Sequence, residues 1–170
     1  MGMEWFVGIV TALAGAVNGG VLMTLAEPTL MDVPAFWELY VGSCLIGGAV
    51  LPILVIRLAK PLSDSVIAFT SASDGLASLM AELVSEFGLA SVTAPIGIGV
   101  GLVLWVVFGV ALIPLVLGAV GAGTMFTFPH VGFGVFVGYA IYGFTLGGFF
   151  GLAVQALSKR AVTEELAAAG

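Results

Sequence analysis

The sequence predicts an all-α membrane protein, a bundle of four transmembrane helices with a cytoplasmic amphipathic helix between the second and third spans. Three observations lead to this fold class. Hydrophobic residues make up 61% of the 170 residues and charged residues only 8%, against roughly 25% charge in soluble domains. The apolar residues form four long continuous runs. All lysines and arginines lie at the end of the second run or shortly after the second or the fourth run.

This composition also excludes classes of function. With a mean hydropathy of +1.24, the chain lacks the polar surface that a soluble enzyme of this size needs. Four basic residues against ten acidic ones lack the positive footprint of a nucleic-acid binder, so no nucleic-acid partner is expected. The single cysteine, Cys44, forms neither an internal disulfide nor a cysteine metal cluster. The acidic excess, with only two lysines, indicates a halophile.

The four runs have the length of membrane helices. A bilayer core about 30 Å thick takes about 20 helical residues, whereas a membrane β-strand has about 10 residues of alternating polarity. The run at the N-terminus is preceded by Glu4 and by no basic residue, so we expect a retained helix rather than a cleaved signal peptide. One membrane domain over residues 1–170 is expected, with spans at 5–26, 36–58, 94–117 and 131–157.

The basic residues orient this bundle. The loops at 27–35 and 118–130 contain no lysine or arginine. The positive-inside rule therefore places both termini and the loop 59–93 in the cytoplasm of a multi-pass plasma-membrane protein. The residues that set this orientation are Arg57, Lys60, Lys159 and Arg160.

Aromatic residues give a partial check on the spans. Trp5 is expected at the inner membrane interface, and Trp37 and Tyr40 at the outer one. Trp105 falls in the middle of the third span. There it is expected to pack against a helix or to face lipid, with substrate stacking as the alternative.

The loop 59–93 contains an apolar stripe of helical period that begins after Asp74. The stripe predicts an amphipathic helix that ends at Gly88. Its polar face is acidic, which favours packing against the bundle or a partner over binding to an anionic membrane surface. The apolar positions are Leu76, Leu79, Met80, Leu83, Val84 and Phe87.

Small residues spaced by four mark one face of two spans. This spacing lets helix backbones approach closely. The interpretation left open is whether these faces pack within one chain or join copies of it. They consist of Gly143, Gly147 and Gly151 in the fourth span, and Ala12, Ala16 and Gly20 in the first.

Polar residues inside the spans are few. Asn18 in the first span is expected to make a helix–helix hydrogen bond, with a substrate or ion contact as the alternative. His130, the only histidine, is expected to pack at the outer end of the fourth span, because one imidazole is too few for a bis-histidine haem. Pro52 predicts a kink in the second span. No catalytic residue, metal site or cofactor is predicted.

The run Ile96-Gly-Ile-Gly-Val-Gly-Leu-Val-Leu-Trp105, with Pro114 after it, resembles a family of small four-span membrane proteins common in haloarchaea. So do Tyr142-Gly143 and the glycines that follow in the fourth span. Three residues before the Tyr-Gly pair, the family pattern has a histidine, where this chain has Tyr139. The resemblance implies a fold and no particular chemistry.

These observations predict a non-catalytic integral membrane protein, an accessory subunit or scaffold of a membrane assembly. Its partners would be the lipid bilayer and either another protein or a second copy. An enzyme is not expected, because no serine or cysteine has an intramembrane base near it in sequence. The alternative is a small oligomeric permease or channel, whose pore would need the polar residues Asn18, Thr11, Ser43 and Thr145.

Overall fold

The computed structural model describes residues 2–70, 88–121 and 128–169, and the side chains of 5–33, 35–57, 88–121 and 128–160. Within these ranges the chain is helical with short turns and contains no strand. The helices are α1 (Gly2–Ala26), the 3₁₀ turn η1 (Pro28–Asp32), α2 (Pro34–Thr70), α4 (Ala90–Leu104), the π-helix η2 (Trp105–Leu112), α5 (Ile113–Ala119) and α6 (Phe133–Ala169).

Four helical segments are long and apolar enough to cross a bilayer, which confirms the all-helical, four-span prediction. They lie within α1, α2, the continuous α4–η2–α5 helix, and α6. Their bounds are Trp5–Ala26, Ala35–Arg57, Ala90–Ala119 and Phe133–Arg160.

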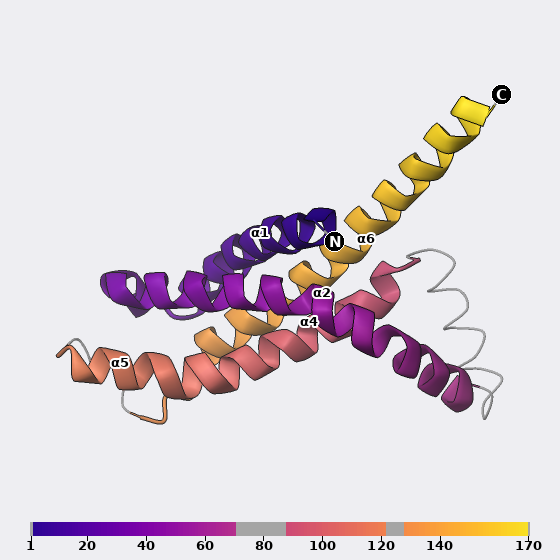
Figure 1. Ribbon diagram of the computed structural model, residues 1–170. Helices are drawn as coiled ribbons and strands as arrows, with labels where there is room; N and C mark the ends of the chain where they lie inside the picture. The colour runs from indigo at the N-terminus through magenta and orange to yellow at the C-terminus, as the bar shows by residue number, and fades with distance from the viewer. Residues whose placement is uncertain (1, 71–87, 122–127, 170) are drawn as a thin grey trace.

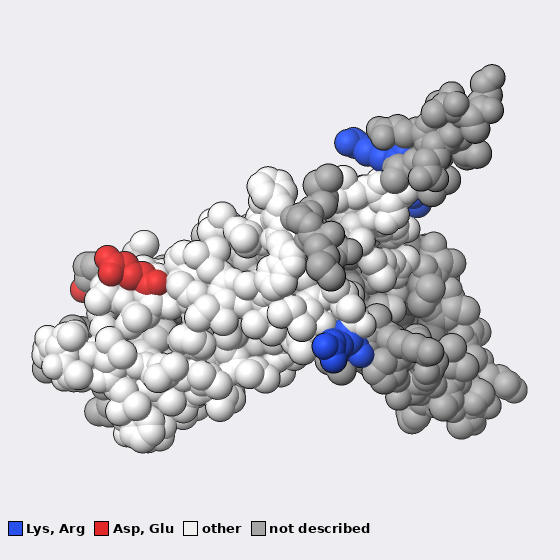
Figure 2. Space-filling view, in the orientation of Figure 1, with Lys and Arg blue, Asp and Glu red and all other residues white. Residues whose placement is uncertain are grey.

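The spans form a ring in which α6 packs along both α1 and α4, and α2 closes the ring by contacting the same two helices. Figure 1 shows the two termini and the far end of α2 at one end of the bundle, and η1 and α5 at the other. Figure 2 shows the described basic residues toward the first end, the described acidic residues at the second, and an uncharged surface between them. Among the described side chains, the two signs of charge are therefore separated along the bundle axis.

Helical structure extends into both ends of the predicted loop 59–93. Helix α2 continues to Thr70, and α4 begins at Ala90. The apolar run ends near Arg57, but hydropathy shows where a membrane span ends and not where backbone hydrogen bonding stops. The amphipathic helix expected from Asp74 to Phe87 lies outside the described residues. Gly88 has φ +53°, a conformation that glycine adopts without strain.

The third span contains an irregularity that links it to α6. Its central segment, Trp105–Leu112, is π-helical, and Pro114 follows it. Because proline has no N–H, the carbonyl of Val110 lacks the donor that a residue at position 114 would supply in an α-helix. The backbone N–H of His130 donates to this carbonyl at 3.2 Å. The turn that leads into α6 is thereby fixed to the third span.

Helix α2 changes direction along its length (Figure 1), and Pro52 is buried inside it. A Cβ built on Gly8 of α1 would lie 3.1 Å from the Cγ of Pro52 and 2.5 Å from the carbonyl oxygen of Gly48. The α1 and α2 backbones therefore approach as closely as a glycine in α1 allows.

Candidate functional site

The glycines of α6 lie against α4 of the same chain. A Cβ on Gly147 would collide with the carbonyl oxygen of Thr93, and one on Gly143 would collide with the carbonyl oxygen of Gly97. At Gly151 a Cβ would collide with the Thr93 hydroxyl. The two backbones are thus in direct contact, and this face is covered within one chain.

The small residues of α1 are buried in the same way. Ala12 and Ala16 are buried, and a Cβ on Gly48 of α2 would collide with the Cβ of Ala12. Gly20 faces the Trp37 ring, since a Cβ there would lie 3.3 Å from Cζ3. The structure therefore places the small residues of the first span within one chain, as it does those of the fourth.

Three tyrosines fill the centre of the ring of helices. Tyr40 of α2 and Tyr139 and Tyr142 of α6 are all 0% exposed. The rings of Tyr40 and Tyr139 meet edge to face, with centroids 5.2 Å apart. Tyr40 was expected at the outer membrane interface. Its ring faces the interior of the bundle, because a position near the start of α2 sets its depth and not the direction it faces.

The hydroxyls of these tyrosines are satisfied inside the chain. Ser43 Oγ donates to the carbonyl of Tyr40 at 2.7 Å, so the hydroxyl of Tyr139, 2.7 Å from Ser43 Oγ, acts as the donor to it. Tyr142 donates to the carbonyl of Cys44 at 2.5 Å. Tyr40 donates to the carbonyl of Ala16 at 3.3 Å. These bonds join α6 to α2 and α2 to α1 across the interior.

The sequence analysis missed this tyrosine cluster, defined as Tyr40, Ser43, Cys44, Tyr139 and Tyr142. A signal for it exists. Tyr139 and Tyr142 are three residues apart, and Tyr40 stands three and four residues before Ser43 and Cys44. Each set therefore occupies one face of its helix. When two apolar spans each carry a polar face of this kind, the two faces are expected to pack against each other.

The hydrogen bonds of the cluster hold the helices together, and its described side chains do not form a catalytic arrangement. The partners of Ser43 Oγ include a carbonyl and a phenol, and neither is a base that could activate a nucleophile. Cys44 is buried and free. Among the described residues, no group of three metal-ligating side chains comes together.

His130 lies at the acidic end of the bundle beside Glu27. The imidazole Nε2 is 3.8 Å from Glu27 Oε1, and both side chains are partly buried. Glycines make room for this pair, because a Cβ on Gly132 or on Gly134 would lie 2.9 Å from Glu27 Oε2. With its backbone bonded to Val110, His130 occupies a packed position between α1, the third span and α6.

Asn18 lies on the outward face of α1. Its side chain is exposed, as are those of Val17 next to it and of Val21, almost one helical turn further along. Within the described residues, the expected helix–helix hydrogen bond is not formed by Asn18. By contrast, the hydroxyls of Thr11 and Thr24 both return to carbonyls of their own helix, each at 2.8 Å.

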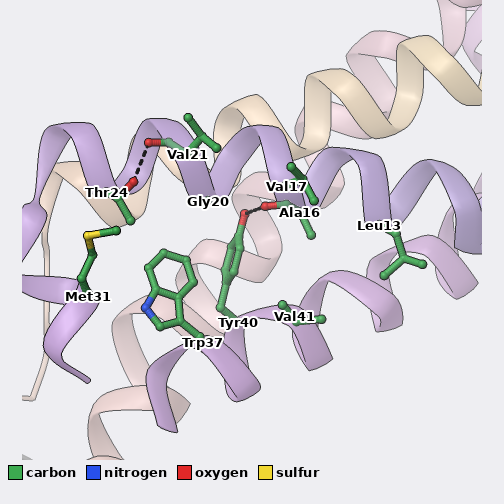
Figure 3. Close-up of a pocket in the computed structure, with 10 residues that line it drawn as sticks. All are labelled: Leu13, Ala16, Val17, Gly20, Val21, Thr24, Met31, Trp37, Tyr40 and Val41. Atoms are coloured by element: carbon green, nitrogen blue, oxygen red, sulfur yellow. Dashed lines mark hydrogen bonds between the residues drawn. The ribbon is translucent and has the colours of Figure 1, made fainter. Parts of the chain in front are cut away.

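A groove between α1 and α2 opens on the outer surface near the acidic end, with a volume of about 480 Å³. Figure 3 shows Tyr40 at its floor with the hydroxyl pointing to Ala16, and Trp37 beside it. The Trp37 indole donates to the carbonyl of Leu30 at 3.1 Å, so it offers no free donor to the groove. A second groove of about 580 Å³ lies between α2 and α4, lined by residues that include Gly47, Pro95 and Val103. Both grooves are apolar.

Trp105 takes part in helix packing. Its ring is half-buried and meets Phe136 of α6 edge to face, with centroids 5.1 Å apart. A Cβ on Gly109 would lie 3.1 Å from its Cδ1. The indole therefore fills the space between η2 and α6.

No protein-family model, curated protein or solved structure matches the chain. A functional proposal therefore rests on the residues and their geometry.

Proposed function

We propose that the chain is a non-catalytic, multi-pass protein of the plasma membrane that serves as an accessory subunit or scaffold of a membrane assembly. Four apolar helices and an uncharged body between two charged ends support the membrane location. Each span carries exposed large apolar side chains, as lipid contact requires. We also propose that the chain comes from a halophile and is related to the small four-span haloarchaeal proteins.

The observation that carries this proposal is the filled interior. Three buried tyrosines occupy the centre of the bundle, and their hydroxyls bond to the chain itself. A transporter built from one chain needs an interior path lined by free polar groups. The unused hydrogen-bonding capacity of Asn18 points outward instead, which favours a protein whose contacts are made at its surface.

The alternative, a permease whose pore lies between copies, has little to line that pore. Of the four polar residues available, Thr11, Ser43 and Thr145 are buried inside one chain. Only Asn18 faces outward. One amide per chain is a poor lining for a hydrophilic path.

Two measurements separate these functions. Affinity-tagged chain purified from its own membranes in mild detergent should bring down a partner at fixed stoichiometry, and tagging that partner should recover the chain. Liposomes containing the chain alone should lose glycerol and K⁺ no faster than empty liposomes, with an ionophore as the positive control for K⁺. Faster loss of either solute, together with no reciprocal partner, would contradict the scaffold proposal and favour the permease.

The proposed orientation puts both termini in the cytoplasm, because the basic residues Arg57, Lys159 and Arg160 cluster at their end of the bundle. In intact cells a membrane-impermeant maleimide should label Thr29→Cys, which is exposed at the acidic end. Ser158→Cys, exposed at the basic end, should react only after permeabilisation. Labelling of Ser158→Cys from outside would reverse the topology.

A further inference from the structure

We propose that two copies of this chain associate through the outward face of α1, with the Asn18 carboxamides of the two copies hydrogen-bonded to each other. This inference rests on the proposed function, in that it names a second copy as one partner of the surface contacts. The observations are the depth of Asn18, its lack of a partner, and the spacing of its neighbours.

Asn18 lies near the middle of its span. The first span runs from Trp5 to Ala26, 22 residues, so at 1.5 Å per residue Asn18 is about 4 Å from its centre. At this depth there is no water to bond an exposed amide. A carboxamide left unpaired in hydrocarbon is costly.

Asn18 is also an exception on the outer surface. Other outward side chains at similar depth in the described spans are apolar, among them Val17, Val50 and Val103. The hydroxyl of Thr24, nearer the acidic end, donates its hydrogen bond to the carbonyl of Val21 in the same helix. Among the described residues, Asn18 is thus an exposed polar side chain at mid-span whose hydrogen-bonding groups find no partner within the chain.

The neighbours of Asn18 form the seam of a helix pair. Ala14, Asn18, Val21 and Leu25 are spaced by four, three and four residues, the spacing of the core positions in a left-handed coiled coil. Val21 and Leu25 are exposed and Ala14 is half-buried. The small side chain of Ala14, one turn from Asn18, allows close approach. An asparagine at one core position of such a seam fixes register and favours a pair.

Symmetry favours a second copy of the chain as the partner that packs against the outward face of α1. Copies inserted with the same topology are related by an axis along the membrane normal, so Asn18 of one copy stands at the same depth as Asn18 of the other. A carboxamide carries both a donor and an acceptor, so two of them across a two-fold axis bond reciprocally. A different partner would need its own polar group at that depth. The seam residues carry no charge that would repel a second copy.

The test is the dimerisation equilibrium of the full chain in lipid vesicles, followed by energy transfer as lipid dilutes the protein. Asn18→Leu removes the amide, and because lipid is as apolar as leucine, the new side chain gains nothing from the contact. We expect dimerisation about tenfold weaker for Asn18→Leu, and retained for Asn18→Gln. Because Asn18 makes no contact that the fold needs, the helical circular dichroism should not change.

Cross-linking locates the interface. Oxidation in membranes should join two copies of Val21→Cys, whereas Val103→Cys, equally outward but on α4, should stay uncoupled. A monomeric wild type, an unchanged dimer in Asn18→Leu, or cross-linking at Val103→Cys instead would overturn the proposal. If Asn18→Leu instead released a different protein from a monomeric chain, the second copy would be refuted and the scaffold function retained.

Discussion

Replacing Gly147 with leucine should force α6 away from α4 and lower the free energy of unfolding by about 3 kcal/mol or more. A Cβ at this position would already collide with the carbonyl oxygen of Thr93 and lie 2.9 Å from the Cα of Ala94. Both obstacles are backbone atoms, which no rotamer change can move. The helices must separate, and dispersion attraction along the whole α4–α6 contact falls as they do.

The neighbouring glycine provides the control. Gly148 has no atom within 4 Å of a built Cβ, so Gly148→Leu adds the same side chain one residue away without a collision. Thermal unfolding in detergent should show a large drop in Tm for Gly147→Leu and little change for Gly148→Leu. Equal melting of the two variants would mean that the α4–α6 contact is not as close as described. A Gly147→Leu chain that keeps its Tm but loses its dimer would instead place this face between copies.

The second large effect is expected at Tyr142. Tyr142→Ala should cost about 3–5 kcal/mol of unfolding free energy, because the fully buried ring leaves a cavity in the centre of the bundle. Tyr142→Phe keeps the ring and loses only the bond to the Cys44 carbonyl, so it should cost about 1 kcal/mol. The difference between these variants measures the packing of the ring separately from its hydroxyl.

Phe144 is the matched control for this pair. It stands two residues further along α6, and its ring is exposed on the outer surface. Phe144→Ala should therefore leave the Tm in detergent nearly unchanged. If Phe144→Ala and Tyr142→Ala were equally destabilising, the tyrosines could not be the core of the bundle.

The positions of the spans follow from sequence because hydropathy measures the property that decides them. A run of apolar residues long enough to cross the bilayer must be helical, since its backbone polar groups find no other partners in lipid. The helix ends are less well predicted. Helix α2 runs past the basic residues that end its span, because charge limits membrane depth and does not stop backbone hydrogen bonding.

The direction in which a side chain faces could not be read from the spans. In α1, apolar residues occupy every face, so the pattern does not distinguish the side toward α6 from the side toward lipid. Asn18 was therefore expected to bond within a helix pair and instead faces outward, and the burial of Tyr40 among the helices was not foreseen. In a membrane a polar side chain turns toward a hydrogen-bond partner, and that partner can lie inside the bundle or on a neighbouring molecule.

The spacing of Gly143, Gly147 and Gly151 predicts a close helix contact but not its partner. Which helix is on the other side depends on the three-dimensional arrangement, in which Gly97 and Thr93 supply the facing backbone. The tyrosine cluster is similar, because three of its residues lie on α2 and two on α6, about a hundred residues apart in sequence. Single-helix periodicity carries no information on such pairs.

Water should not reach the filled interior of the bundle, and the native thiol tests this most directly. Cys44 is 0% exposed beside the tyrosine cluster. A small water-soluble methanethiosulfonate, added to both sides of the membrane, should leave Cys44 unmodified for as long as it takes to modify Ser158→Cys completely. After unfolding in hot SDS, Cys44 should react. Modification of Cys44 in the folded, membrane-embedded protein would contradict a filled interior and favour a transport path through it.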